Sequence, residues 1–201
     1  MLFYCVPRQD TNPLAHRLLE HFGSVSRVLD AGPEELEKIE GVGENISTFL
    51  SLIPAVGRYY QISRAACGVI MHDLNKCGEF LYPYLADRKN EMVYLLCLDA
   101  KRKVICCEKV GEGSVNSANV PVRRVVEVAL AANATTVVLA HNHPGGLAFP
   151  SGEDISTTMY VAKALGAMDI ELADHIVVSD SDFVSMVQSG YYRPGVDNRI
   201  G

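Results

Sequence analysis

The chain has 201 residues, 48% of them hydrophobic and 21% charged, which is the composition of a globular protein and excludes wholesale disorder. No apolar run approaches the roughly 18 residues of a membrane-spanning helix, and the apolar start lacks a basic leader, so we expect a cytoplasmic protein without a membrane partner. The net charge is −6, with −2 in residues 1–66 and −4 in the rest, so neither part is a basic module that would bind nucleic acid mainly through phosphates.

The chain up to about residue 60 is predicted to be helical. Pro13 at the start and Gly23 at the end delimit the first helix. Pro54 is expected to kink or end the last one, because proline removes a backbone hydrogen bond. The predicted helices and helical turns are 13–22, 24–29, 32–39 and one from about residue 44.

The remainder of the chain alternates between helical and strand patterns. Helices are predicted over 65–80, 120–133 and 151–168, and strands over 91–99, 103–110, 135–140 and 176–179. This order predicts a three-layer α/β domain over 65–201, behind a small all-helical domain over 1–64.

The most informative stretch leaves the predicted strand at 135–140 and reaches the first turn of a helix. His141 and His143 point to the same side of an extended segment, so both imidazoles can reach one ion. If Ser151 caps the helix, Asp154 lies one turn in and faces the same loop. Two histidines and one carboxylate leave a fourth position for water, which is the arrangement of a catalytic zinc. The six cysteines contain no CxxC pair, so a thiolate zinc site is not expected.

Each half of this pattern also has an ordinary structural interpretation. Ser151 and Asp154 fit a variant of the capping box, and a His-x-His at a strand end is often incidental. Together, at the mouth of a buried strand, they favour a metal site. The pattern does not fit the HNH nucleases, the HExxH proteases or the zinc deaminases, whose motifs are spaced differently.

The motif is similar to one in a known group of enzymes. H-x-H-P and a later S-x-x-D, with seven residues between the second histidine and the serine, resemble the JAMM motif of MPN+ metalloproteases. The segments 139–144 and 173–178, and the helical front with Ile39-Glu40-Gly41-Val42-Gly43, resemble the bacterial RadC family over nearly the whole chain. The resemblance implies an MPN (JAMM) domain with a central mixed sheet, behind a helix-hairpin-helix-like domain. RadC chains usually have a longer N-terminus, so Met1 is expected to fall inside the first helix of a truncated domain.

The resemblance also implies roles for individual residues. One zinc ion per chain would be held by His141, His143 and Asp154, and Ser151 would help to stabilise the oxyanion. The Asp174-His175 pair, which RadC-like chains share, is expected just before the strand at 176–179 and would hydrogen-bond a zinc ligand or the substrate. A structural role for this pair is the alternative.

The JAMM motif further requires an upstream glutamate as general base, which deprotonates the water and later protonates the leaving nitrogen. The candidates are Glu91, Glu108, Glu112 and Glu127. RadC proteins have a glutamate just before the strand that Glu91 opens, which favours Glu91, although a glutamate at a strand edge is often only solvated. Glu112, in a Gly-Glu-Gly loop, is the second choice.

The turn at Gly41 and Gly43 resembles a helix-hairpin-helix, whose backbone N–H groups bind a DNA phosphate. Glu44 follows it and no Lys or Arg occurs until Arg58, so DNA association is expected to be weak. A turn that only packs a helical bundle is the alternative.

Three functions follow from these patterns. The first is a zinc-dependent hydrolase of amide bonds in a peptide or protein substrate, acting as a peptidase or isopeptidase. The second is a non-enzymatic DNA-associated module for repair or recombination, with the MPN domain as a scaffold. The third, a metal-dependent nuclease, is disfavoured because one zinc with a single carboxylate ligand differs from a two-metal site. The complete ligand set favours the first, and the acidic balance weakens the second.

Overall fold

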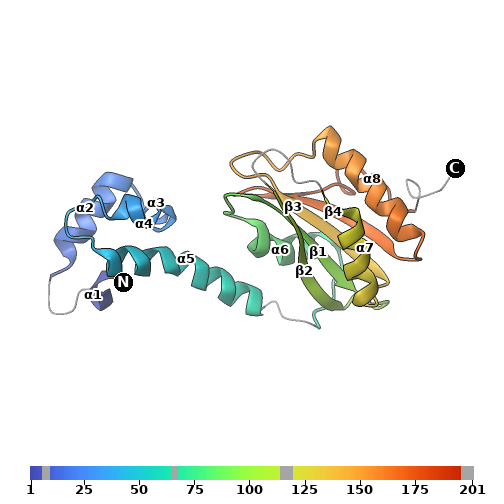
Figure 1. Cartoon of the computed structure of the whole chain (residues 1–201), viewed down its shortest axis with the longest axis horizontal. Helices are drawn as coiled ribbons and strands as arrows, with labels where there is room; N and C mark the ends of the chain where they lie inside the picture. Colours follow the sequence, from blue (N-terminus) through green and yellow to red (C-terminus); the bar gives the residue numbers. More distant parts are fainter. Residues whose placement is uncertain (6–9, 65–67, 114–119, 196–201) are drawn as a thin grey trace. The chain divides into compact units, whose positions relative to one another are not determined.

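The protein divides into two compact units, Met1–Arg64 and Ala65–Gly201 (Figure 1). The computed structural model describes residues 1–5, 10–64, 68–113 and 120–195. Over these ranges, no helix combines the length and the apolar character needed to cross a membrane.

The first unit is helical. Its apolar side chains, among them Leu14, Leu18, Leu36 and Leu50, form one buried core. The long helix α5 continues through Pro54, so the expectation that this proline ends it is wrong. A 21-residue helix tolerates the loss of one backbone bond while its first half packs on the core. The helices are α1 (Leu2–Cys5), α2 (Asn12–Phe22), α3 (Val25–Asp30), α4 (Pro33–Leu36) and α5 (Glu44–Arg64).

The second unit is built on a mixed sheet with the strand order β2-β1-β3-β4-β5. Strands β3 and β4 are parallel and the other neighbours are antiparallel. Its elements are α6 (Leu74–Leu85), β1 (Glu91–Leu98), β2 (Val104–Gly113), α7 (Val122–Ala131), β3 (Thr136–Asn142), α8 (Gly152–Gly166), β4 (Glu171–Val178) and β5 (Phe183–Ser185).

Helices cover both faces of this sheet, which gives three layers (Figure 1). Along β3, Val137 and Leu139 pack in the core under α7 and α8, whereas Val138 and Ala140 pack in the core under α6. His141 continues the first set, so its side chain faces α8. The expected α/β fold class with a central mixed sheet is therefore confirmed.

Two predicted elements are corrected. The helix expected over 65–80 begins only at Leu74, because the Asp73 carboxylate caps it by accepting from the Lys76 N–H at 2.8 Å. Ile70 instead pairs with Lys103 in a β-bridge; residues 65–67 lie outside the described residues. The strand expected over 176–179 begins earlier, at Glu171. The prediction was too short because polar residues within the strand, which are hydrogen-bonded in the structure, interrupt its apolar pattern. Strand β5 was not predicted.

Candidate metal centre

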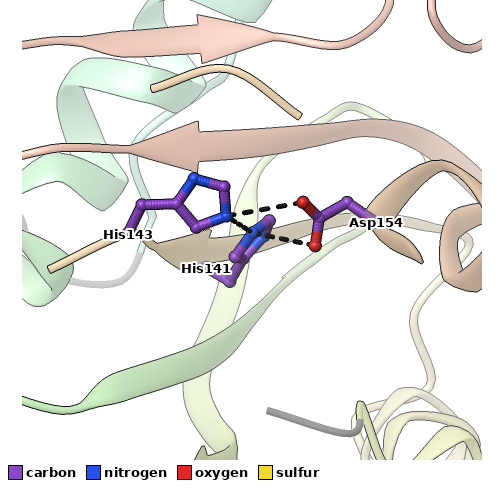
Figure 2. Close-up of side chains that lie close together, drawn as sticks. All are labelled: His141, His143 and Asp154. Carbon is purple, nitrogen blue, oxygen red and sulfur yellow. Dashed lines mark hydrogen bonds and ion pairs between the residues drawn. The ribbon is translucent and has the colours of Figure 1, made fainter. Parts of the chain in front are cut away.

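Three side chains converge between the end of β3 and the start of α8 (Figure 2). The Nε2 atom of His141 lies 3.0 Å from Nε2 of His143 and 3.1 Å from Oδ1 of Asp154. The Nε2 atom of His143 lies 3.4 Å from Oδ2 of Asp154. Tetrahedral zinc with bonds of roughly 2.0–2.1 Å separates its ligand atoms by about 3.4 Å. The group therefore has the ligand types and spacing to bind one metal ion.

The backbone explains why the histidines face the same way. His141 pairs with Val177 in the parallel β3–β4 ladder, and the His143 N–H donates to the Val178 carbonyl at 2.8 Å. The segment therefore stays extended as far as His143. Residues two apart in an extended segment lie on one face, so the two imidazoles end side by side.

Asp154 is held by the N-terminus of α8. The Ser151 Oγ accepts from the Asp154 N–H at 3.1 Å, and the Asp154 carboxylate accepts from the Ser151 N–H and hydroxyl, both at 2.7 Å. Burial raises the pKa of Asp154, but the bond from Ser151, together with those from His141 and His143 when their Nε2 atoms carry protons, outweighs it and holds this pKa below its usual value. The capping box and the candidate metal site thus use the same aspartate.

His143 presents an unprotonated nitrogen to the cluster. Its Nδ1 lies 3.2 Å from the Leu147 carbonyl oxygen, which can only accept, so the proton of the neutral ring sits on Nδ1. Nε2 then keeps its lone pair toward Asp154 and His141. A proton on Nε2 would instead bond to Asp154, which raises the pKa of His143 against the effect of burial; a metal ion would take the place of this proton.

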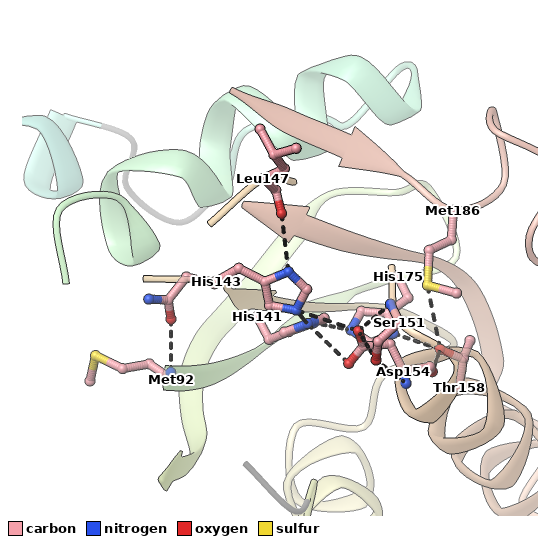
Figure 3. A network of polar contacts seen from close by, with 10 residues as sticks. Met92, His141, His143, Leu147, Ser151, Asp154, Thr158, His175 and Met186 are labelled. Carbon is pink, nitrogen blue, oxygen red and sulfur yellow. Dashed lines mark hydrogen bonds and ion pairs between the residues drawn. The ribbon is translucent and has the colours of Figure 1, made fainter. Parts of the chain in front are cut away.

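His141 reaches the same state through a chain of hydrogen bonds (Figure 3). The Thr158 hydroxyl lies 2.6 Å from the Asp154 carbonyl oxygen, to which it donates, so it accepts from Nδ1 of His175 at 2.6 Å. Nε2 of His175 then accepts from Nδ1 of His141 at 2.8 Å. Burial lowers the pKa of His175 well below its usual value, so it is neutral and carries one proton. His141 is left with a lone pair on Nε2.

Glu91 lies on the same face of the sheet as the histidines. Val93 pairs with His141, and Glu91 stands two residues earlier at the first position of β1. The charge of Glu91 also raises the pKa of His143, although less than Asp154 and Leu147 do; burial lowers this pKa. This placement makes Glu91 the candidate base nearest in register to the cluster.

The other candidate bases are engaged elsewhere. Glu112 pairs across the sheet with Met92, whose side chain packs on the α6 face, and it forms an ion pair with Lys109 at 2.7 Å. Glu108 pairs with Arg124 and Glu127 with Arg123 in exposed ion pairs.

Asp174 and His175 lie within β4 and not before it. His175 contacts His141, as described above. Asp174 is buried on the opposite face, where it accepts from the Ser185 hydroxyl and from the N–H groups of His175 and Val187. Burial raises its pKa to about 6, and these hydrogen bonds oppose the shift. Asp174 therefore fixes the segment that contains β5, while His175 supports a metal-ligand candidate.

Gly41 and Gly43 lie between α4 and α5 in the helical unit. Gly41 has a φ of 93°, which favours glycine, and a Cβ there would meet Nη2 of Arg17 at 3.1 Å. Arg17 also donates to the Glu40 carbonyl oxygen at 3.2 Å. The guanidinium group of Arg17 on α2 thus lies against this turn. Because Arg17 is far from the turn in the sequence, its proximity was not predicted.

Two residues near the cluster were missed in the sequence. Thr158 is a polar residue on the buried face of α8, one turn after Asp154, and this spacing was a usable signal. Asn142 is 2% exposed between the two histidines, and a polar residue at a buried strand position was the corresponding signal.

Comparisons with known proteins agree with this architecture. Residues 71–191 match a family described as RadC-like JAB domain. The chain is 34% identical to a UPF0758 protein of Ruegeria pomeroyi, over 95% of this chain and 85% of that protein. A UPF0758 protein of Rhodobacter capsulatus is also 34% identical, with 94% and 89% covered, and one of Cellvibrio japonicus is 34% identical with 89% and 80% covered. Because its second unit matches the RadC-like JAB domain and contains the His-His-Asp group, and because these relatives match most of its length, the chain belongs to the RadC family.

Proposed function

We propose that this protein is a zinc-dependent hydrolase of amide bonds, acting as a metallopeptidase or isopeptidase. The observation that carries the proposal is the convergence of three potential ligand atoms, with the Nε2 atoms of both imidazoles directed toward the Asp154 carboxylate. A zinc ion held by His141, His143 and Asp154 would lower the pKa of its water toward about 7 and polarise a substrate carbonyl.

The surrounding residues supply the proton transfers and orient the ligands. Glu91, on the face of the histidines, would accept the proton of the attacking water and return it to the leaving nitrogen. The Ser151 hydroxyl is bonded to the Asp154 carboxylate and so orients it. A further role in stabilising the oxyanion requires this exposed hydroxyl to turn toward the substrate.

A DNA-associated repair or recombination module is the alternative, and one observation favours it. Arg17 brings a cation to the Gly41 turn, where a phosphate would otherwise face Glu44. A DNA-associated function does not account for the His-His-Asp group, and we therefore place this function second.

Hydrolysis by the untagged, zinc-loaded protein tests the proposal. Quenched fluorescent peptides and isopeptide-linked peptides should be cleaved, and a chelator should stop the cleavage until zinc is restored. Cleavage that a chelator leaves unchanged would contradict a metal mechanism.

A further inference from the structure

We propose that Asn142 is a positioning residue that holds the start of β1, and with it the Glu91 carboxylate, at a fixed separation from His143. The inference rests on the hydrolase function proposed above, in which Glu91 is the base. Asn142 alternates with the two histidines along β3, so its side chain leaves the strand away from the metal-ligand atoms. It is 2% exposed, and both ends of its amide are hydrogen-bonded.

Strands β1 and β3 separate at the mouth of the site. Their backbone pairing runs from Leu98 and Thr136 to Val93 and His141, where it stops. Beyond this point β3 follows β4, as the His143 N–H bond to Val178 shows. Strand β1 follows β2 up to the pair of Glu91 with Gly113. The two strands therefore form a fork with Glu91 on one arm and His143 on the other.

The fork makes room for the reaction. If the β1–β3 ladder continued in register, Glu91 would stand directly opposite His143. Opposite residues in an antiparallel ladder have Cβ atoms only about 4.5–5.5 Å apart. Their side chains would then touch and leave no space for a water molecule and a substrate carbonyl. Glu91 and His143 must therefore lie farther apart than in a regular ladder. Their separation must also be fixed, because a general base has to stay within hydrogen-bond reach of the proton that it accepts.

Asn142 bridges the two arms of this fork. Its Oδ1 accepts from the Met92 N–H at 2.8 Å, a bond drawn in Figure 3, and its Nδ2 donates to the Asn90 carbonyl oxygen at 3.1 Å. The Asn90 carbonyl belongs to the peptide group before Glu91, and the Met92 N–H to the one after it. Both peptide groups that flank the Cα of Glu91 are thus bound by one side chain.

The chemistry of the bridge requires asparagine. One bond needs an acceptor and the other a donor, and an amide provides both at the ends of a short, planar group. Aspartate has nearly the same shape but no donor, so its second oxygen would face the Asn90 carbonyl and repel it. Alanine would leave both backbone groups unpaired.

Kinetics of the zinc-loaded Asn142→Asp and Asn142→Ala variants on a quenched fluorescent peptide library test this role. We expect kcat to fall about 10–100-fold with little change in KM and one zinc per chain retained. In the Glu91→Gln background, Asn142→Asp should cause no further loss, because Asn142 acts through Glu91. Asn75→Asp, at an exposed position of α6, is the matched control and should keep the wild-type kcat.

Loss of zinc, unchanged kcat, or an equal further loss in the Glu91→Gln background would each overturn the inference. Crystal structures of the wild type and Asn142→Asp provide a second readout. It requires no measurable activity, and it can be obtained even if Asn142→Ala does not fold. Residues 90–92 should move away from β3 while His141 and His143 stay in place. If Glu91 does not move in Asn142→Asp, the inference is overturned, whether or not any peptide is cleaved. The absence of peptide cleavage, by itself, contradicts only the proposed function.

Discussion

The buried ring of His175 lies behind His141, with its Nε2 atom 2.8 Å from Nδ1 of His141. The Thr158 hydroxyl closes the chain of hydrogen bonds at the Asp154 carbonyl, so two metal-ligand candidates are linked through His175 and Thr158. This chain places the proton of His141 on Nδ1 and leaves Nε2 for the metal.

His175→Ala and Thr158→Val should therefore weaken zinc binding about 10–100-fold without abolishing it, because they remove the partner that orients His141. Competition with a chromogenic zinc chelator measures the affinity. Ser156→Ala is the matched control, since the Ser156 hydroxyl makes the same kind of bond to a carbonyl four residues earlier but is exposed. Complete loss of zinc from a folded His175→Ala protein would mean that His175 is itself a ligand.

Glu91→Gln should keep one zinc per chain and lose hydrolysis, because glutamine fills the same space but cannot accept the proton of the water. Zinc content and peptide cleavage are measured on the same preparation. Glu112→Gln, on the other face of the sheet, should retain cleavage. A Glu91→Gln protein without zinc would make Glu91 a ligand, and one with wild-type turnover would return the role to Glu112.

Asp174 should make stability depend on pH. Its folded-state pKa of about 6 lies above its ordinary value of 3.8, so the folded protein binds the proton more tightly than the unfolded chain. Its stabilising contribution is present below about pH 4 and is lost as the pH rises through 6. About two pKa units correspond to roughly 3 kcal/mol of unfolding free energy.

Asp174→Asn should remove this contribution, because an amide keeps the acceptor for the two backbone N–H groups and does not titrate in this range. Urea unfolding of the metal-free protein at pH 4.5 and 7.5 measures it. Relative to wild type, the variant should be more stable at pH 7.5 than at pH 4.5. Asp180→Asn, at an exposed position, should show no such difference, and an equal difference in both variants would contradict the assignment to Asp174.

DNA binding should be weak and sensitive to salt. The helical unit has excess acidic residues, and the Gly41 turn has Arg17 on one side but Glu44 after it. Titration of a labelled duplex at low salt and at about 150 mM salt measures the effect. Arg17→Ala should abolish the low-salt binding. Tight binding that survives about 150 mM salt would favour the DNA-associated module.

Much of the site could be predicted from sequence because it is local. His141, His143, Ser151 and Asp154 lie within one strand, loop and helix start, and the period of each element fixes which way they face. The capping box of Ser151 and Asp154 is present in the structure, and Asp154 also belongs to the group that could bind a metal ion.

The remainder depends on contacts between distant segments. Asp174 and His175 look like loop residues, yet they are buried in β4 because Ser185, Thr158 and His141 satisfy their polar atoms. The bridge from Asn142 to the residues beside Glu91 spans about 50 positions and depends on sheet order, which no local pattern specifies. Arg17 reaches the Gly41 turn in the same non-local way.

His141, His143 and Asp154 should together bind one zinc ion. Elemental analysis of the protein purified without a histidine tag tests it most directly, with His143→Ala and the exposed His72→Ala as a matched pair. We expect one zinc per chain in the wild type and in His72→Ala, and none in a folded His143→Ala protein. A full equivalent of zinc in His143→Ala, or none in a wild type given excess zinc, would contradict it.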